Sequence, residues 1–350
     1  MSINPTRVKV LGVGGGGCNA VNRMILDGIQ NVDVYAVNTD IQHLQTLQVP
    51  NKIQIGEKLT RGLGAGAKPE IGEQAAQEDA DRMREILKET DMLFIAAGLG
   101  GGTGTGAAPV IAEIAKELGI LTVAIVTKPF NFEGNRKMQI AAQGLEKLKD
   151  KVDTYIVINN QRLTEIEEKN FTIGNAFKMV DDILSISVRS ITDVLTTPAI
   201  INVDFSDMRT VMEKGGLALI GLGEASDSKK DLAFERAITS PLLEGNTISG
   251  AKKLLLTFWL SEDVPFKDME SVFARVQEQV NQDALILFGV SMEKGRENFM
   301  RITIVATDFE NQQKVKKPDP PTKPQSPSPT IQPVFPDDET PAYVRRKKII

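Results

Sequence analysis

The run Gly100–Gly106, GGGTGTG, constrains this chain more than any other stretch. It follows the apolar run Met92–Ala97 and precedes a helical pattern from Ala107 to Leu118, so it predicts a strand-to-helix turn rich in residues without a Cβ atom. Glycines cost conformational entropy on folding, so a run of them needs a structural reason. One reason is close approach of backbone N–H groups to phosphate oxygens at a helix N-terminus. The alternative, a flexible linker, fits poorly because a strand and a helix adjoin the run directly.

Apolar runs alternate with helical patterns through the first half of the chain. The predicted strands span 7–13, 32–38, 92–97, 120–127 and 154–159. The predicted helices follow the first strand to about 27 and then span about 69–89, 107–118 and 137–149. This alternation is typical of an α/β fold with parallel strands and helices on both faces, in which ligands bind at the carboxyl ends of the strands. Three glycine-rich loops are expected at those ends, at 12–19, 61–67 and 100–106.

The first of these loops admits a second interpretation. Gly12-x-Gly14-x-x-Gly17 matches the dinucleotide fingerprint, with Asp33 or Asp40 about 20 residues on as a ribose ligand. Taken alone it suggests NAD, but such a site needs no second phosphate loop. No Gly-x-x-x-x-Gly-Lys-Ser/Thr run occurs, which excludes a P-loop NTPase. Two glycine loops facing one pocket suit a triphosphate better than a pyrophosphate.

The composition excludes several classes of function. The formal net charge is −5, so no basic face is implied and nucleic acid is not an expected partner. A single cysteine excludes an internal disulfide framework and suits a reducing cytosol. The single histidine, His43, excludes a His-rich zinc site and is expected at the surface. With no signal core and no run of about 18 apolar residues, we expect a cytoplasmic chain without direct membrane insertion.

A long central helix is predicted from Gly174 to about Leu195. Its apolar residues recur at steps of three or four: Phe177, Val180, Leu184, Val188, Ile191 and Leu195. At about 1.5 Å per residue its roughly 22 residues span about 33 Å, and Pro198 ends it. Phe177 and Asp181 share a face near its start; Asp181 can accept from guanine N1–H and the 2-amino group while Phe177 stacks on the ring. The other interpretation makes Phe177 a core residue and Asp181 a solvated charge, and the residues alone favour neither.

The second half of the chain predicts a smaller α/β domain. Strands are expected near 217–222, 253–260, 285–290 and 301–307, with helices near 229–239 and 268–280. The strand 301–307 alternates as if half-exposed, and Trp259 is expected in the core. Asp204 and Asp207 open a short helix that runs to about Lys214, where acidic residues are ordinary helix caps.

The last stretch changes composition. Eight prolines fall between Pro318 and Pro336, which predicts a disordered tether biased to polyproline II. In the segment 337–350 acids precede an apolar pair and bases follow, which favours a short helix in a partner's groove.

These motifs carry a resemblance to a known family. GGGTGTG resembles the tubulin signature loop, and residues 7–310 resemble the FtsZ family, the bacterial tubulin-like division GTPases. The supporting motifs, in the family's order, are 14–20 (GGGGCNA), 38–40 (NTD), 128–134 (KPFNFEG) and 202–207 (NVDFSD). The resemblance implies a Rossmann-type GTP-binding domain at 1–172, a central helix at 173–197, a C-terminal GTPase-activating domain at 198–311, a disordered linker at 312–336 and a partner-binding peptide at 337–350.

The resemblance also implies the site residues. Those expected to bind GTP, which brings Mg²⁺ with it, are Gly15, Gly16, Gly17, Cys18, Asn19, Gly101, Gly102, Thr103, Gly104, Thr105, Glu133, Lys137, Asn160, Phe177 and Asp181. The family has an Arg four residues after the glutamate; here Lys137 stands there with Arg136 beside it, and either side chain can take the role. Asp204, Asp207 and Asn202 are the implied catalytic residues, contributed to the nucleotide of a neighbour stacked head to tail.

The implied function is a cytoskeletal GTPase that polymerises head to tail into filaments of the division ring at midcell, beneath the inner membrane. Besides itself, its implied partners are assembly regulators and membrane-tethering adaptors, which bind Pro341, Tyr343, Val344 and Arg345 of the tail peptide. The alternatives are a non-polymerising nucleotide-dependent enzyme with a Rossmann-type site and a relative that binds GTP without hydrolysing it.

Overall fold

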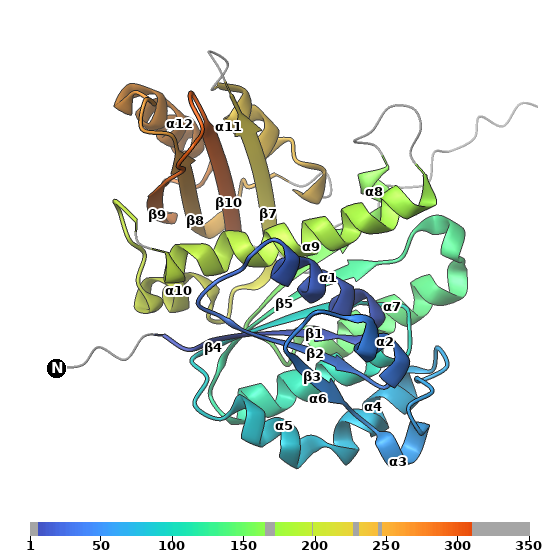
Figure 1. Cartoon of the computed structure of the whole chain (residues 1–350). Helices are drawn as coiled ribbons and strands as arrows, with labels where there is room; N and C mark the ends of the chain where they lie inside the picture. The colour runs from blue at the N-terminus through green and yellow to red at the C-terminus, as the bar shows by residue number, and fades with distance from the viewer. Residues whose placement is uncertain (1–5, 165–171, 198, 227–230, 244–246, 310–350) are drawn as a thin grey trace, which may run out of the picture. The chain divides into compact units, whose positions relative to one another are not determined.

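A parallel sheet forms the first half of the chain (Figure 1). The computed structural model describes residues 6–164, 172–197, 199–226, 231–243 and 247–309. The strands are β1 (Val8–Val13), β2 (Asp33–Asn38), β3 (Asn51–Gln54), β4 (Met92–Gly98), β5 (Leu121–Lys128) and β6 (Thr154–Asn159). They lie in the order β3-β2-β1-β4-β5-β6, and every neighbouring pair is parallel.

Helices cover both faces of this sheet, as the alternating pattern predicts. They are α1 (Gly14–Leu26), α2 (Ile41–Thr46), α3 (Glu57–Thr60), α4 (Pro69–Glu78), α5 (Ala80–Leu87), α6 (Thr103–Glu117), α7 (Asn135–Lys149) and α8 (Asn160–Leu163). Along β1, Val8 and Val10 pack in the cluster that contains α1, while Leu11 and Val13 pack in the cluster that contains α4 to α7. Alternate residues of β1 therefore belong to two different cores, one on each face of the sheet.

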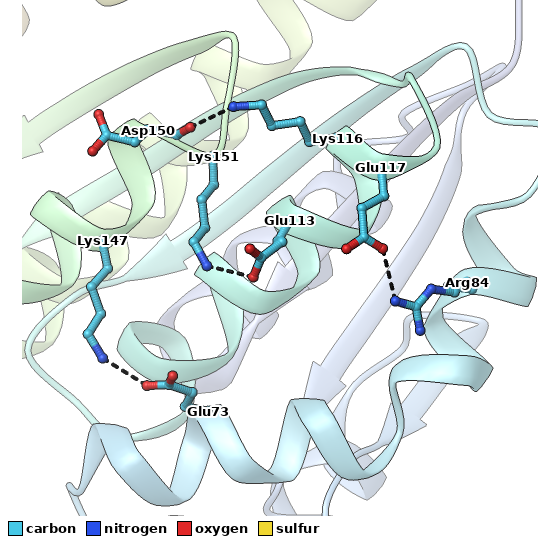
Figure 2. A network of polar contacts seen from close by, with 8 residues as sticks. All are labelled: Glu73, Arg84, Glu113, Lys116, Glu117, Lys147, Asp150 and Lys151. Atoms are coloured by element: carbon cyan, nitrogen blue, oxygen red, sulfur yellow. Dashed lines mark hydrogen bonds and ion pairs between the residues drawn. The ribbon is translucent and has the colours of Figure 1, made fainter.

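Charged side chains link the helices of the second face to one another (Figure 2). The pairs are Arg84 with Glu117 at 2.9 Å, Lys151 with Glu113 at 2.6 Å, Lys147 with Glu73 at 2.8 Å, and Lys116 Nζ with the Asp150 carbonyl at 2.8 Å. Exposed pairs contribute on the order of 0–1 kcal/mol each. The buried apolar contacts beneath them therefore dominate the stability of this layer.

The long helix α9 (Ile173–Thr196) confirms the predicted central helix and lies between the first sheet and the second half of the chain (Figure 1). Its 24 residues span about 36 Å at about 1.5 Å per residue. Thr172 caps it by accepting from the Asn175 N–H at 3.2 Å. Val180, Leu184, Val188 and Ile191 are buried against the first core, as their spacing predicts.

The second half contains α10 (Phe205–Met212), β7 (Gly216–Ala225), α11 (Asp231–Ile238), β8 (Ala251–Leu260), α12 (Phe266–Gln279), β9 (Leu285–Met292) and β10 (Met300–Phe309). Its strands lie in the order β7-β10-β8-β9, with β10 antiparallel to both neighbours. The start of β7 pairs with β6, so the ten strands form one hydrogen-bonded series. The domain boundaries at 172 and 197 stay predictions, and the predicted linker and tail peptide lie outside the described residues.

The prediction that the strand at 301–307 is half-exposed is wrong. Thr303 and Thr307 are buried, because the face of β10 that carries them packs toward α9 and α10. Val305, on the same face, lies in the core cluster that contains these helices, and Thr307 Oγ1 donates to the Val211 carbonyl of α10 at 2.9 Å. Trp259, predicted in the core, is half-buried.

One predicted helix is divided, two others begin earlier than predicted, and one strand was missed. The single helix expected at 69–89 is two, since the chain turns at Asp79, whose carboxylate accepts from the Gly56 N–H at 2.8 Å. Helices α1 and α6 begin inside their glycine runs, at Gly14 and Thr103, rather than after them. The short edge strand β3 has no apolar run to reveal it.

Candidate functional site at the carboxyl edge of the parallel sheet

A cavity of about 590 Å³ opens where the parallel strands end, and all three glycine loops line it. Most of the predicted nucleotide-binding residues lie in its wall: Gly15, Gly16, Asn19, Gly101, Gly102, Thr103, Gly104, Glu133, Lys137, Asn160, Phe177 and Asp181. The cavity falls within the usual range for a small-molecule site, roughly 300–1,000 Å³. The strand ends therefore converge on one pocket, as the alternating pattern predicts.

The two glycine runs meet at the base of this cavity. Gly14 has φ +71°, and a Cβ atom there would lie 2.5 Å from the Gly104 backbone nitrogen. Helices α1 and α6 start at these positions, and neither has a side-chain cap or an acidic residue in its first turn. Their first N–H groups have no intrahelical partner. The close approach of two uncapped helix N-termini makes a site suited to an anion with several oxygens.

Three predicted residues support this base without lining the cavity: Gly17, Cys18 and Thr105. Thr105 Oγ1 accepts from the Gly100 N–H at 2.9 Å and so closes the second glycine loop. Cys18 is fully buried, and its Sγ contacts the Gly12 carbonyl at 3.3 Å. Burial raises the pKa of the Cys18 thiol to about 12, so the thiol is neutral and acts as a core side chain.

An aromatic and acidic group forms one end of the cavity. Phe177 is 42% exposed and packs edge-on against Phe130, with ring centroids 5.4 Å apart. Its exposed face on the cavity does not fit the interpretation of Phe177 as a core residue. Asp181 also lines the cavity, and burial, reinforced by Asp182 and opposed by Arg23, raises its pKa to about 7. A solvated surface charge would not show this shift.

Glu133 and Lys137 form a pair in the cavity wall. Lys137 Nζ lies 2.8 Å from Glu133 Oε2, and Glu133 Oε1 accepts from the Phe130 N–H at 2.9 Å. Lys137 lines the cavity, whereas Arg136 is exposed outside it. Asn160 is 4% exposed, and its Oδ1 has no hydrogen-bond partner among the described residues. An unpartnered buried acceptor beside a cavity suits a ligand hydroxyl group.

The predicted set of GTP-binding residues omits the part of the wall at the end of β2 and just after it, although Asp40 was considered as a ribose ligand. Asn38, Asp40 and His43 line the cavity, and Thr39 Oγ1 bonds Thr103 Oγ1 at 2.7 Å. His43, predicted at the surface, is partly exposed and lines the cavity, because α2 packs back over the end of β2. The Asn38-Thr39-Asp40 run was the signal for this part of the wall, because an acidic residue just after a strand can cap a helix that starts there. Asp40 does so by accepting from the His43 N–H at 3.1 Å.

The predicted catalytic acids lie at the opposite end of α9 and outside this cavity. Asp204 Oδ1 accepts from the Asp207 N–H at 2.8 Å, and Asp207 Oδ2 accepts from the Asp204 N–H at 3.3 Å. This reciprocal capping of α10 confirms the structural interpretation of the pair. Asn202 is exposed beside them, and its Oδ1 accepts from the Ala199 N–H at 3.0 Å. The tail residues Pro341, Tyr343, Val344 and Arg345 lie outside the described residues.

Comparison with known proteins gives this geometry a family. Residues 7–168 match the model of the Tubulin/FtsZ family, GTPase domain, and residues 216–310 match that of the FtsZ family, C-terminal domain. The cell division protein FtsZ of Aquifex aeolicus is 61% identical over 308 residues, which cover 88% of this chain and 84% of that protein.

The chain belongs to the FtsZ family of cell-division GTPases.

Further relatives agree with this assignment. Cell division protein FtsZ 1 of Archaeoglobus fulgidus is 47% identical over 88% of this chain and 83% of its own length. The structure of an empty FtsZ dimer from M. jannaschii superposes with a TM-score of 0.81 at 42% identity, covering 87% of this chain and 89% of that one. The more distant CetZ2 of Haloferax volcanii, at 21% identity and a TM-score of 0.74, shares the fold. Within the described part of the FtsZ-family chain, every helix is too short or too polar to cross a lipid bilayer.

Proposed function

We propose that this chain binds GTP in the cavity and hydrolyses it only where a second copy, stacked head to tail, supplies Asp204 and Asp207. The observation that carries the proposal is the separation of the two half-sites by α9, about 36 Å long. The acids of one molecule are thus too far from its own glycine loops to reach the phosphates bound there. A heterologous contact of this kind extends into a filament instead of closing a dimer.

The cavity suits each part of the nucleotide. The uncapped starts of α1 and α6 suit the phosphates, and the Glu133–Lys137 pair and Asn160 Oδ1 suit the ribose and its first phosphate. Phe177 offers a ring face for stacking, and Asp181 offers an acceptor for guanine N1–H and the 2-amino group. Because Lys137 lines the cavity and Arg136 does not, we assign the family's arginine role to Lys137.

Mg²⁺ is proposed to arrive with the triphosphate. No group of three or more His, Cys, Asp or Glu side chains within the described ranges is placed to hold a metal ion. The phosphate oxygens and water supply the ligands that Mg²⁺ prefers. At the interface, Asp204 and Asp207 of the neighbour then orient and polarise the attacking water, with Asn202 beside them.

The same proposal extends to assembly and location. The FtsZ dimer from M. jannaschii, as its description names it, supports self-association of a chain 42% identical to this one. We infer that the filaments form the division ring and that the segment 337–350 binds membrane-tethering adaptors, while assembly regulators act on the filament itself. The chain does not need to enter the membrane in this arrangement.

Light scattering and phosphate release, followed together over a range of protein concentrations with GTP or ATP, test this proposal. With GTP, scattering and activity per molecule should rise together from near zero above one threshold concentration. ATP should support neither, and Asp181→Ala should weaken GTP binding and reduce this preference, because the carboxylate is the group that needs donors on the base. Activity per molecule that is constant at all concentrations would exclude a shared site, and equal affinity for ATP and GTP would exclude the role of Asp181.

A further inference from the structure

Asn38, His43 and Asn19 form a chain of hydrogen bonds in the cavity wall. Asn38 Nδ2 lies 3.0 Å from His43 Nδ1, and His43 Nε2 lies 2.9 Å from Asn19 Oδ1. Asn38 is 3% exposed, His43 is half-buried and Asn19 is exposed to the cavity. These hydrogen bonds thus connect the buried Asn38 to Asn19 at the surface of the cavity.

The buried end sets the direction of every bond in this chain. Asn38 Oδ1 accepts from the backbone N–H of Thr39 at 2.9 Å. A backbone N–H can only donate, so the amide oxygen of Asn38 must face Thr39 and its NH₂ group must face His43. His43 Nδ1 is therefore an acceptor without a proton. The neutral imidazole then carries its proton on Nε2 and donates it to Asn19 Oδ1.

These hydrogen-bond directions allow the Asn19 amide only one orientation. Its oxygen is used by His43, and its Nδ2 donates to no other group within the described part of the chain, so both N–H donors are available to a ligand. Asn19 also lies beside the start of α9. Arg23 of α1 pairs with Asp182 of α9 at 2.8 Å. Asn19 is one turn closer to the cavity than Arg23, next to the turn that carries Asp181.

We propose that His43 is a positioning residue for base recognition: it locks the Asn19 amide so that its nitrogen donates to O6 of guanine. This inference rests on the proposed GTP-binding function. Guanine presents an acceptor at O6 beside the N1–H donor that Asp181 accepts, whereas adenine presents an amino donor at the same position. An Asn19 amide locked in this direction meets adenine donor to donor, which adds a second discrimination to that of Asp181.

The tautomer is measured directly, because His43 is the only histidine in the chain. In the intact full-length protein labelled with ¹⁵N-histidine, at a pH where the ring is neutral, a nitrogen-detected spectrum contains one imidazole. We expect Nε2 with its proton and Nδ1 without one, both before and after addition of GTP. A protonated Nδ1, or shifts averaged between the two tautomers, would overturn the proposal. This measurement does not depend on GTP binding, so it is separable from failure of the proposed function.

Binding to variants then tests the role in recognition. Loss of one neutral hydrogen bond corresponds to about a 3- to 10-fold weaker affinity. His43→Ala should weaken GTP binding by this factor. His43→Gln should restore much of it, because an amide has one acceptor and one donor, like the neutral ring. The matched control is Gln45→Ala, which removes an exposed polar side chain from the same helix and leaves the hydrogen bonds among Asn38, His43 and Asn19 in place.

The decisive ligand is 6-thio-GTP, in which a weakly accepting sulfur replaces O6. The intact protein should bind it several-fold more weakly than GTP, and this ratio should fall toward one in His43→Ala, because the Asn19 donor is then no longer directed at that atom. An unchanged ratio, with both ligands weakened equally, would show that His43 supports the fold of the wall and would overturn the proposal. An intact protein that binds neither ligand would instead refute the proposed function and leave the tautomer result standing.

Discussion

Two inactive variants should rebuild one active site when they are mixed. Asp207→Asn keeps an amide oxygen that can accept from the Asp204 N–H, so the cap of α10 survives while the negative charge is lost. Replacement by Ala would also remove the hydrogen bond from the Asp204 N–H to residue 207, at about 0.5–1.5 kcal/mol, although Asp204 would still cap the helix. Gly102→Ser disrupts the other half-site, because its Cβ atom would lie 2.8 Å from the Ala65 Cβ atom and 3.0 Å from the Lys68 nitrogen. Each variant alone should release almost no phosphate.

The size of the recovery follows from the geometry of the contact. In a head-to-tail contact one molecule supplies the pocket and the other supplies the acids. In an equal mixture with random assembly, one interface in four joins an intact pocket to an intact acid pair, so phosphate release should return to about a quarter of the unmodified rate. This value assumes that both variants enter the same filaments, which sedimentation of differently tagged proteins measures.

Controls separate this recovery from nonspecific effects. A mixture of Asp207→Asn with Asp204→Asn has intact pockets throughout, but no interface has both acids, so it should stay inactive. Glu213→Gln removes the same charge from an exposed position at the end of the same helix and should keep full activity. If the two complementary variants sediment together and the mixture releases no phosphate, the shared active site is refuted.

The other predictions concern charge, packing and the tail. Burial raises the pKa of Asp181 to about 7, and donors on guanine would lower it. GTP affinity should therefore be constant above pH 7 and fall below it, and calorimetry should find this pH dependence lost in Asp181→Asn. Gly106→Ala should destabilise the protein by about 1–3 kcal/mol in urea unfolding, because its Cβ atom would lie 1.9 Å from the Pro69 carbonyl oxygen. At Gly174, where the nearest atom is 4.0 Å away, the same change should be neutral or stabilising, and equal effects at both positions would contradict the packing argument. Deleting 337–350 should leave phosphate release nearly unchanged, since the residues that line the cavity in the described part of the chain fall between Gly15 and Asp181. The deletion should abolish filament recruitment to adaptor-coated vesicles, and normal recruitment would refute the tail assignment.

Local patterns in the sequence were sufficient for the order of elements and for the edge of the sheet that carries the site. The strands β1, β2, β4, β5 and β6 and the helix α9 occur within one or two residues of their predicted bounds. Buried parallel strands need continuous apolar runs, and a helix that packs on a core needs apolar residues repeating about every 3.6 positions. Both patterns can therefore be recognised in the sequence alone. The glycine runs were visible for a similar reason, since residues that must lack a Cβ atom can only be glycine.

Long-range contacts decided the remaining features. The pattern at 301–307 predicts one exposed face, but Thr303 and Thr307 are buried because distant segments, α9 and α10, pack on that face of β10. His43 became part of the cavity wall because α2 folds back toward α1, bringing its ring to Asn19, 24 positions earlier in the chain. Phe177 and Asp181 were ambiguous in sequence for the same reason: a helical stripe shows which residues share a face, but only the packed chain decides whether that face meets a core, a cavity or water.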